Sequence, residues 1–157
     1  MAPRSILVLT GSGISAESGV ATFRGGGGLW EGHAIEDVAT PEAWARDPAA
    51  VWRFYQLRRR GLVGVAPNPA HVALAELERA ARAKGDEYLL VTQNVDALHE
   101  AAGSTEPLHM HGELERLRCE RCGAGVRDRE SLDPDRFVPC AACGHARLRP
   151  DVVWFGE

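Results

Sequence analysis

Four cysteines are the residues of this 157-residue sequence whose type and spacing most directly predict chemistry. They form two C-x2-C pairs, Cys119 with Cys122 and Cys140 with Cys143, and seventeen residues separate the pairs. Two short knuckles of this kind can place four thiolates at the corners of a tetrahedron, which suits zinc, whereas the alternative is four buried free cysteines. Because four sulfur ligands leave no position open for water, we expect one structural zinc ion.

The residues that follow each pair fit the same interpretation. Gly123 and Gly144 come directly after the second cysteine, where a knuckle turn commonly needs a positive φ. His145 lies beside the second pair, and we expect it to be a bystander rather than a metal ligand.

A glycine-rich turn follows an apolar run at residues 5–10. The segment Gly11–Ala16 (GSGISA) fits the G-x-G-x-x-G/A fingerprint, in which a diphosphate approaches the glycines and lies against a helix N-terminus. Any tight turn between a strand and a helix can also contain two glycines. The acidic ribose ligand of dehydrogenases, expected about 20 residues further on, is missing, so hydride transfer is not predicted.

Polar side chains also follow a second apolar run, at residues 87–92. Gln93, Asn94 and Asp96 stand at the end of this predicted strand, where open parallel sheets bind their ligands. An Asx-turn that begins the next helix would explain Asp96 alone, but not the other two. His109 and His111 lie two residues apart and would face the same way on an extended segment, where either could serve as a base or have a structural role.

The elements that must position these residues are strands at 5–10 and 87–92, each followed by polar residues and a helix. This order predicts parallel β/α units. We expect helices at 41–47, 48–60 and 69–84, and a short one that begins near Ser15 as its N-cap. In the 69–84 helix, one face carries Ala70, Leu74, Leu77 and Ala81, and Gly85 follows as a C-cap.

The predicted fold is an α/β class fold: an incomplete Rossmann-like parallel sheet with a small zinc-ribbon module and a helical module. Its predicted domains are 1–112 with 149–157, which includes a helical insert at about 31–68, and the zinc module at 113–148. The tract 25–28 holds four glycines and is expected to be a mobile loop.

The composition is that of an ordinary globular protein, with 45% hydrophobic and 25% charged residues. No apolar run approaches the roughly 20 residues needed to cross a bilayer, and no signal peptide is present, so we expect a cytoplasmic protein without a membrane partner. The formal net charge of -4 gives no general attraction to nucleic acid.

Five segments resemble the sirtuins, the NAD-dependent protein-lysine deacylases: Gly11–Arg24, Thr92–His99, His111-Gly112, the two cysteine pairs, and Arg149–Glu157. They stand in the family's order and span nearly the whole chain. Two departures are mild: Ser12 stands where alanine is common, and Val20-Ala21 where Ile-Pro is frequent. The resemblance implies a Rossmann-like domain that carries a zinc module and a helical module. NAD, as co-substrate, and an acyl-lysine protein would meet in the cleft between them.

The resemblance also implies roles for single residues. His111 would be the general base that takes a proton from a ribose hydroxyl, and no protein nucleophile is required. The residues implied to bind NAD are Gly11, Ser12, Gly13, Ile14, Ser15 and Ala16 at the diphosphate, Phe23, Arg24 and Trp30 in the cofactor loop, Gln93 and Asn94 at the ribose, and Val95 and Asp96 at the nicotinamide. The substrate backbone would pair with Val153, Trp154 and Phe155 as an added strand.

Tyr55 and Arg58 lie three apart on a predicted helix and hence share a face. Their spacing resembles the Y-x-x-R of the sirtuin branch that removes acidic acyl groups, which implies activity on succinyl or malonyl lysine and weaker activity on acetyl lysine. The alternative is a solvated charge run at 58–60 beside a buried Tyr55.

Two other interpretations of the whole chain are open. The resemblance leads us to expect further strands after Glu157 that bind the adenosine half of NAD, so the chain is either part of a sirtuin or a short, weakly active or inactive one. Alternatively, a zinc ribbon with a basic surface would bind nucleic acid through Arg116, Arg118, Arg121, Arg127 and Arg129. Interspersed acidic residues and the lack of stacking aromatics in that segment argue against nucleic acid.

Overall fold

The computed structural model describes residues 3–22, 29–30 and 32–157, and for 29–30 only the backbone. It divides into two compact units. The first unit contains Met1–Thr22 and Gly64–Met110, and the second contains Phe23–Val63 and His111–Glu157. Each unit carries part of the predicted site.

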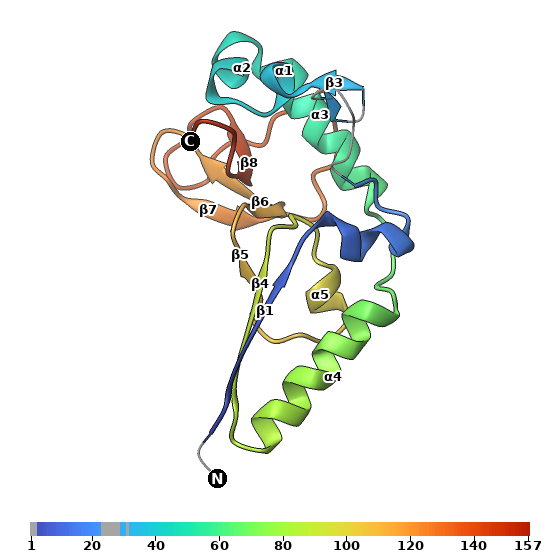
Figure 1. Cartoon of the computed structure of the whole chain (residues 1–157). Helices are drawn as coiled ribbons and strands as arrows, with labels where there is room; N and C mark the ends of the chain where they lie inside the picture. The colour runs from blue at the N-terminus through green and yellow to red at the C-terminus, as the bar shows by residue number, and fades with distance from the viewer. Residues whose placement is uncertain (1–2, 23–28, 31) are drawn as a thin grey trace. The chain divides into compact units, whose positions relative to one another are not determined.

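The first unit is built on a parallel sheet in the order β1-β4-β5 (Figure 1). Strand β1 (Ser5–Thr10) pairs in parallel with β4 (Glu87–Thr92), and β4 pairs in parallel with β5 (Leu108–His109). The predicted parallel β/α units are therefore confirmed. Short helix α5 (Leu98–Ala101) follows β4, so the polar residues 93–96 lie at the carboxyl end of that strand.

Helix α4 (Pro69–Ala83) begins where the sequence predicts and covers one face of this sheet. Its Ala81 forms a core cluster with Tyr88 and Leu90 of β4. The apolar face identified in the sequence is only partly buried, because Ala70 and Leu77 are exposed. The buried residues of α4 are His71, Ala75, Glu78 and Ala81. Because the polar residues His71 and Glu78 are buried, the buried face of α4 differs from the apolar face identified in the sequence.

The turn after β1 is a 3-10 helix, η1 (Ser12–Ser18), with Gly11 at its N-cap. The prediction that Ser15 caps a helix is wrong. Ser15 is buried inside η1, and its hydroxyl bonds to residues that follow β4. The side chain that secures η1 from outside is Asn68, the N-cap of α4, whose Nδ2 donates to the carbonyl of Ile14 at 2.7 Å.

The second unit contains helices α1 (Ile35–Val38), α2 (Pro41–Arg46) and α3 (Pro48–Gly61), and a short hairpin of β2 (Leu29–Trp30) and β3 (His33–Ala34). Helices α2 and α3 confirm the predicted pair. Each has proline in its first turn and a side-chain cap, Thr40 for α2 and Asp47 for α3.

An antiparallel sheet in the order β7-β6-β8 completes the second unit. It consists of β6 (Gly112–Cys119), β7 (Gly125–Arg127) and β8 (Leu148–Val152). Gly112 has φ 78°, and a Cβ there would lie 2.0 Å from the carbonyl oxygen of Asp151, so only glycine fits. Strand β8 pairs with β6, the strand that ends at Cys119. The predicted domain boundaries remain a prediction.

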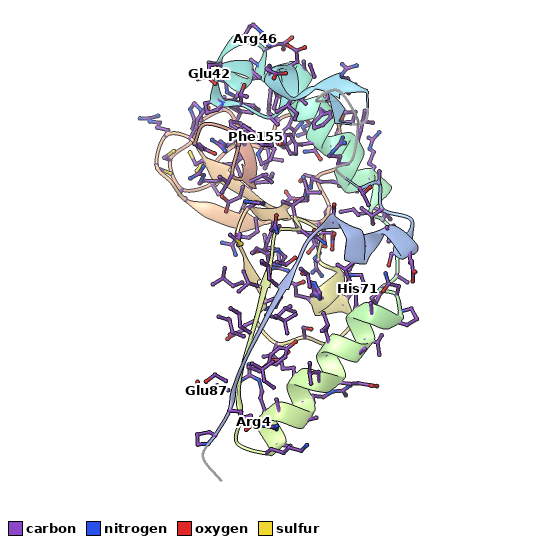
Figure 2. All side chains as sticks on the ribbon, in the orientation of Figure 1. Arg4, Glu42, Arg46, His71, Glu87 and Phe155 are labelled. Carbon is purple, nitrogen blue, oxygen red and sulfur yellow. The ribbon has the colours of Figure 1, made fainter. Side chains whose placement is uncertain are left out.

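Among the described residues, no helix combines the length and the apolar character needed to cross a bilayer. Side chains of both units are drawn in Figure 2, where the labelled His71 lies in the first turn of α4 and Arg4 and Glu87 lie at one end of the parallel strands.

Candidate functional site

The polar residues after β4 form a hydrogen-bonded cluster with η1 in the first unit. Ser15 Oγ donates to Asp96 Oδ2 at 2.9 Å and accepts from Asn94 Nδ2 at 3.0 Å. All three side chains are buried. Residues that the sequence placed at two separate motifs are thus brought together in one site.

Gly11 and Gln93 join the same site. A Cβ added at Gly11 would lie 3.8 Å from the Gln93 amide nitrogen, and one added at Gly13 would meet no described atom within 4 Å. Internal packing therefore does not require glycine at position 13, and the backbone there is open to a ligand. A bare turn beside buried amide and carboxylate groups fits the diphosphate and sugar of NAD.

Asp96 makes a second contact, which corresponds to the Asx-turn considered as an alternative for this residue. Its Oδ1 accepts from the backbone N–H of Leu98 at 3.1 Å, so the predicted Asx-turn is also present. The Asp96 carboxylate therefore accepts hydrogen bonds both from the first residue of α5 and from Ser15.

Two buried histidines beside this cluster were missed by the sequence analysis. His71 and His99 stack edge to face at 4.9 Å, and His99 Nε2 lies 2.9 Å from Thr10 Oγ1. Burial lowers the pKa of both imidazoles below the ordinary value of 6.5. His71 also accepts from the backbone N–H of Asn68 and completes the cap of α4. Only the position of His71 at N3 of a helix could have indicated this role.

His109 and His111 differ in their surroundings. His109 Nδ1 donates to the carbonyl of Asn94 at 2.9 Å, and its Nε2 lies 2.8 Å from Glu100 Oε1. Since both ring nitrogens face acceptors, we expect His109 to have a structural role. The expected extended segment is interrupted by a turn at 110–111, and His111 is an exposed residue of the second unit whose carbonyl accepts from Val153.

The four cysteines converge in the second unit as predicted. Their sulfur atoms all lie within 4.8 Å of one another, and the Sγ–Sγ distances are 3.7 Å both for Cys119–Cys143 and for Cys122–Cys140. A tetrahedral zinc with Zn–S bonds of about 2.3 Å has S–S edges of about 3.8 Å, whereas a disulfide bond is about 2.05 Å long. The cysteines therefore fit one structural zinc ion.

The two knuckles have the same backbone design. In each, the N–H of the first cysteine donates to the carbonyl five residues on, and the N–H of the following glycine donates back to that cysteine. Gly123 and Gly144 have φ 74° and 69°, which confirms the predicted turn. His145 lies outside this group of four sulfur atoms, and its Nε2 lies 2.8 Å from Glu120 Oε1.

Glu120 ties the metal site to α2. Its carboxylate accepts from Trp44 Nε1 at 2.6 Å and from Arg147 Nε at 2.8 Å. Burial alone would raise the pKa of Glu120, but these hydrogen bonds and that of His145 lower it to about 2. No motif or spacing in the sequence marks this residue.

Tyr55 and Arg58 share a face of α3 and are both buried, so the alternative of a solvated charge run is wrong for Arg58. The Arg58 guanidinium lies 3.8 Å from the centre of the Phe54 ring. Tyr55 Oη accepts from Trp154 Nε1 at 3.0 Å. Burial raises the pKa of Tyr55, against the opposing effects of this hydrogen bond and of the Arg58 charge.

The backbone N–H groups of 153–155 are engaged within the unit. Val153 donates to His111, Trp154 to the Glu157 carboxylate, and Phe155 to Ala39. An added substrate strand would therefore bind chiefly to the carbonyl groups of this segment. Phe23 and Arg24 lie outside the described residues, as does the side chain of Trp30, and so does the glycine tract 25–28.

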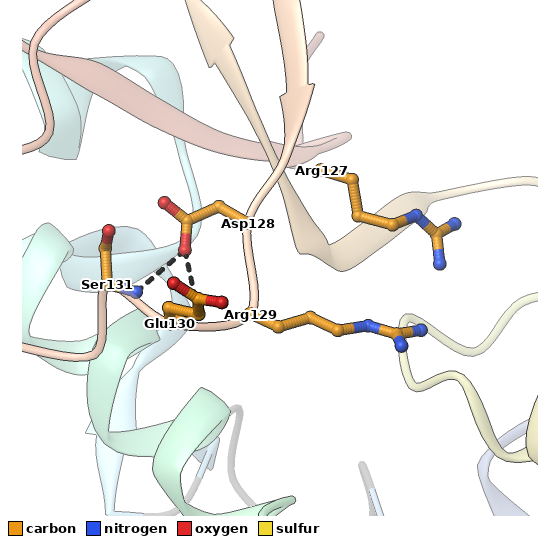
Figure 3. A pocket seen from close by; sticks show the side chains of 5 residues that line it. All are labelled: Arg127, Asp128, Arg129, Glu130 and Ser131. Carbon is orange, nitrogen blue, oxygen red and sulfur yellow. Dashed lines mark hydrogen bonds between the residues drawn. The ribbon is translucent and has the colours of Figure 1, made fainter.

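A pocket of about 400 Å³ lies elsewhere in the second unit, at Arg127–Ser131 (Figure 3). Its floor is a turn in which Asp128 Oδ1 accepts from the N–H groups of Glu130 and Ser131. Arg127 and Arg129 pair with Glu113 and Glu115, and Arg116 and Arg118 lie within 4 Å of acidic groups. Four of the five arginines of the predicted basic surface therefore lie beside carboxylates.

Comparison with known proteins decides the family. The profile of the Sir2 family matches residues 11–157. The chain belongs to the Sir2 family. The Sir2-family chain is 53% identical over 154 residues to an NAD-dependent protein deacylase of Thermus thermophilus, and 55% identical over 157 residues to one of Bdellovibrio bacteriovorus. These matches cover 98% of this chain, but 59% and 65% of the relatives, so the chain spans about three fifths of their length.

Solved structures agree with this Rossmann-like fold. A crystal structure of a Sir2 homologue in complex with NAD matches with a TM-score of 0.83 and 47% identity, over 96% of this Sir2-family chain and 57% of that one. The predicted sirtuin resemblance and α/β fold class are therefore confirmed.

Proposed function

We propose that this protein removes acyl groups from lysine side chains of proteins in an NAD-dependent reaction. Acyl-lysine, NAD and water are consumed, and free lysine, nicotinamide and O-acyl-ADP-ribose are formed. The observation that carries the proposal is the convergence of the Gly11 turn with Ser15, Asn94 and Asp96 in one buried cluster. Relatives at 53% and 55% identity that bear the name NAD-dependent protein deacylase support it.

In this proposal the first unit holds NAD. The diphosphate lies at the open backbone of 11–13, Gln93 and Asn94 bind the ribose, and Asp96 binds the nicotinamide amide. When bound, NAD supplies the ribose carbon that accepts the acyl oxygen as nicotinamide leaves. Because Ser15 fixes both Asn94 and Asp96, the polar atoms are oriented before the ligand arrives.

His111 is the proposed base. It takes a proton from a ribose hydroxyl at a ring nitrogen, a role that an exposed imidazole side chain can fill. His109 does not compete for the role, because both of its nitrogens already face Asn94 and Glu100.

The acyl group is proposed to be acidic. Arg58 offers a planar cation and Tyr55 a hydroxyl on one face of α3, and together these groups match the terminal carboxylate of succinyl or malonyl lysine. Acetyl lysine lacks that carboxylate and would be a weaker substrate.

The substrate backbone lies along 153–155, and the zinc ion is structural. We further propose that the protein acts in the cytoplasm.

Mass spectrometry of the reaction tests the function. The purified, zinc-loaded protein is incubated with NAD and a succinyl-lysine peptide. We expect the free-lysine peptide and O-succinyl-ADP-ribose in equal amounts, and no reaction when NAD is left out. Formation of free lysine without NAD, or of succinate without the ADP-ribose ester, would contradict the proposal.

A further inference from the structure

The hydroxyl of Tyr55 receives a hydrogen bond in the interior of the second unit. Trp154 Nε1 donates to Tyr55 Oη at 3.0 Å, and the two side chains are 2% and 0% exposed. Their rings lie 6.5 Å apart at an interplanar angle of 42°. Since an indole N–H can only donate, Tyr55 Oη must accept here, and its own proton points in another direction.

Trp154 is itself held in place. The Arg149 guanidinium carbon lies 3.5 Å from the centre of the Trp154 ring. Arg149 donates to both carboxylate oxygens of Glu157, at 2.7 and 2.9 Å, and to the carbonyl of Val152 at 2.8 Å. The backbone N–H of Trp154 donates to the same Glu157 carboxylate at 3.0 Å. The stacked Arg149 guanidinium and the hydrogen-bonded main chain therefore fix the direction of the indole N–H.

We propose that Trp154 is a positioning residue for acyl recognition, which fixes the Tyr55 hydroxyl as a donor toward the terminal carboxylate of a succinyl or malonyl group. A carboxylate only accepts hydrogen bonds, so a hydroxyl whose oxygen already accepts from an indole is oriented to donate to it. Without the indole N–H, the hydroxyl rotates more freely and distinguishes less between acidic and neutral acyl groups. This inference rests on the proposed acyl preference and adds how that preference is set.

A double-mutant cycle separates positioning from packing. Trp154→Phe removes the N–H and keeps an aromatic ring, while Tyr55→Phe removes the hydroxyl. The quantity measured is the ratio of kcat/KM for a succinyl-lysine peptide to that for the matched acetyl-lysine peptide. We expect Tyr55→Phe to lower this ratio about ten-fold or more and Trp154→Phe about three- to ten-fold. In the Tyr55→Phe background, Trp154→Phe has no further effect, because its target is gone.

Trp44→Phe is the matched control. The Trp44 ring lies 5.7 Å from that of Trp154, but its Nε1 donates to Glu120 rather than to Tyr55. This variant disturbs the same aromatic cluster and is expected to leave the ratio unchanged.

Each result decides the inference. An unchanged ratio in Trp154→Phe, additive effects in the double variant, or an equal loss in Trp44→Phe would overturn the positioning role and leave NAD-dependent deacylation standing. Calorimetric titration of the two peptides gives the ratio of their affinities, which measures the acyl preference without turnover. If the protein binds the succinyl peptide no better than the acetyl peptide, the inference is overturned. If it binds the succinyl peptide better but shows no NAD-dependent turnover, the proposed function fails and the inference stands.

Discussion

Ser15 and Asp96 are hydrogen-bonded at 2.9 Å in the interior of the first unit, although 81 positions separate them in the sequence. The bond joins the turn after β1 to the residues after β4, two segments proposed to bind different parts of NAD. A substitution that breaks this bond is therefore expected to affect both segments.

Replacing Ser15 by alanine tests this connection. The change leaves Asn94 Nδ2 and Asp96 Oδ2 without their shared partner in a buried site, which costs about 1–3 kcal/mol. We expect the free energy of unfolding in urea to fall by that amount and NAD to bind more weakly. Ser12→Ala, in the same short helix, is the control for stability and should change it by less than about 0.5 kcal/mol. Equal losses in both variants would contradict the role of Ser15.

The buried histidines predict a pH dependence of stability. Burial keeps the pKa of His71 and His99 below 6.5 in the folded state, while the unfolded chain binds protons at about 6.5. Stability therefore rises with pH and is lost as the pH falls below about 6.5, by at most about 1.4 kcal/mol per pH unit for each histidine.

Urea denaturation between about pH 5 and about pH 8, followed by circular dichroism, measures this slope. His99→Gln should flatten the dependence, and His145→Gln, which changes a histidine of the second unit, should not. A wild-type protein with no loss of stability below about pH 6.5 would disagree with neutral, buried imidazoles.

Much of the fold follows from local sequence signals. Proline and a polar cap mark the starts of α2, α3 and α4, and apolar runs mark β1 and β4. These signals act within a few residues and need no tertiary information. The pairing of β8 with β6 and the 3-10 geometry of η1 depend on distant contacts, so the sequence predicted neither.

The candidate site divides in the same way. The cysteines were found because zinc imposes its own spacing, and Gln93, Asn94 and Asp96 because they end a strand. His71 and Glu120 were missed, since each resembles an ordinary polar residue until the fold buries it beside its partners. His109 could be assigned only when both of its acceptors were known.

Removal of one cysteine tests the metal site. Cys140 is buried, and Cys140→Ser takes away one of four thiolates. We expect the purified variant to lose its zinc and the second unit to lose its cooperative unfolding, because metal binding contributes directly to folding. His145→Gln should keep one zinc ion per chain. Full zinc content in Cys140→Ser would contradict four-sulfur coordination.

Arg58→Met tests the acidic-acyl preference. Methionine keeps the packing against Phe54 but removes the charge that would pair with the substrate carboxylate. We expect the succinyl-to-acetyl ratio of kcat/KM to fall about ten-fold or more, as for loss of a charged hydrogen bond. Arg53→Met is the control on the same helix, where the arginine is exposed and pairs with Asp135. An unchanged ratio in Arg58→Met would end the assignment.

The most direct test of NAD-dependent deacylation is nicotinamide release from NAD by the zinc-loaded protein in the presence of a succinyl-lysine peptide. We predict that the wild-type protein and His145→Gln release nicotinamide together with free lysine, and that His111→Ala forms no free lysine although it keeps its zinc and its NAD affinity. Free lysine formed by His111→Ala at the wild-type rate would contradict the account.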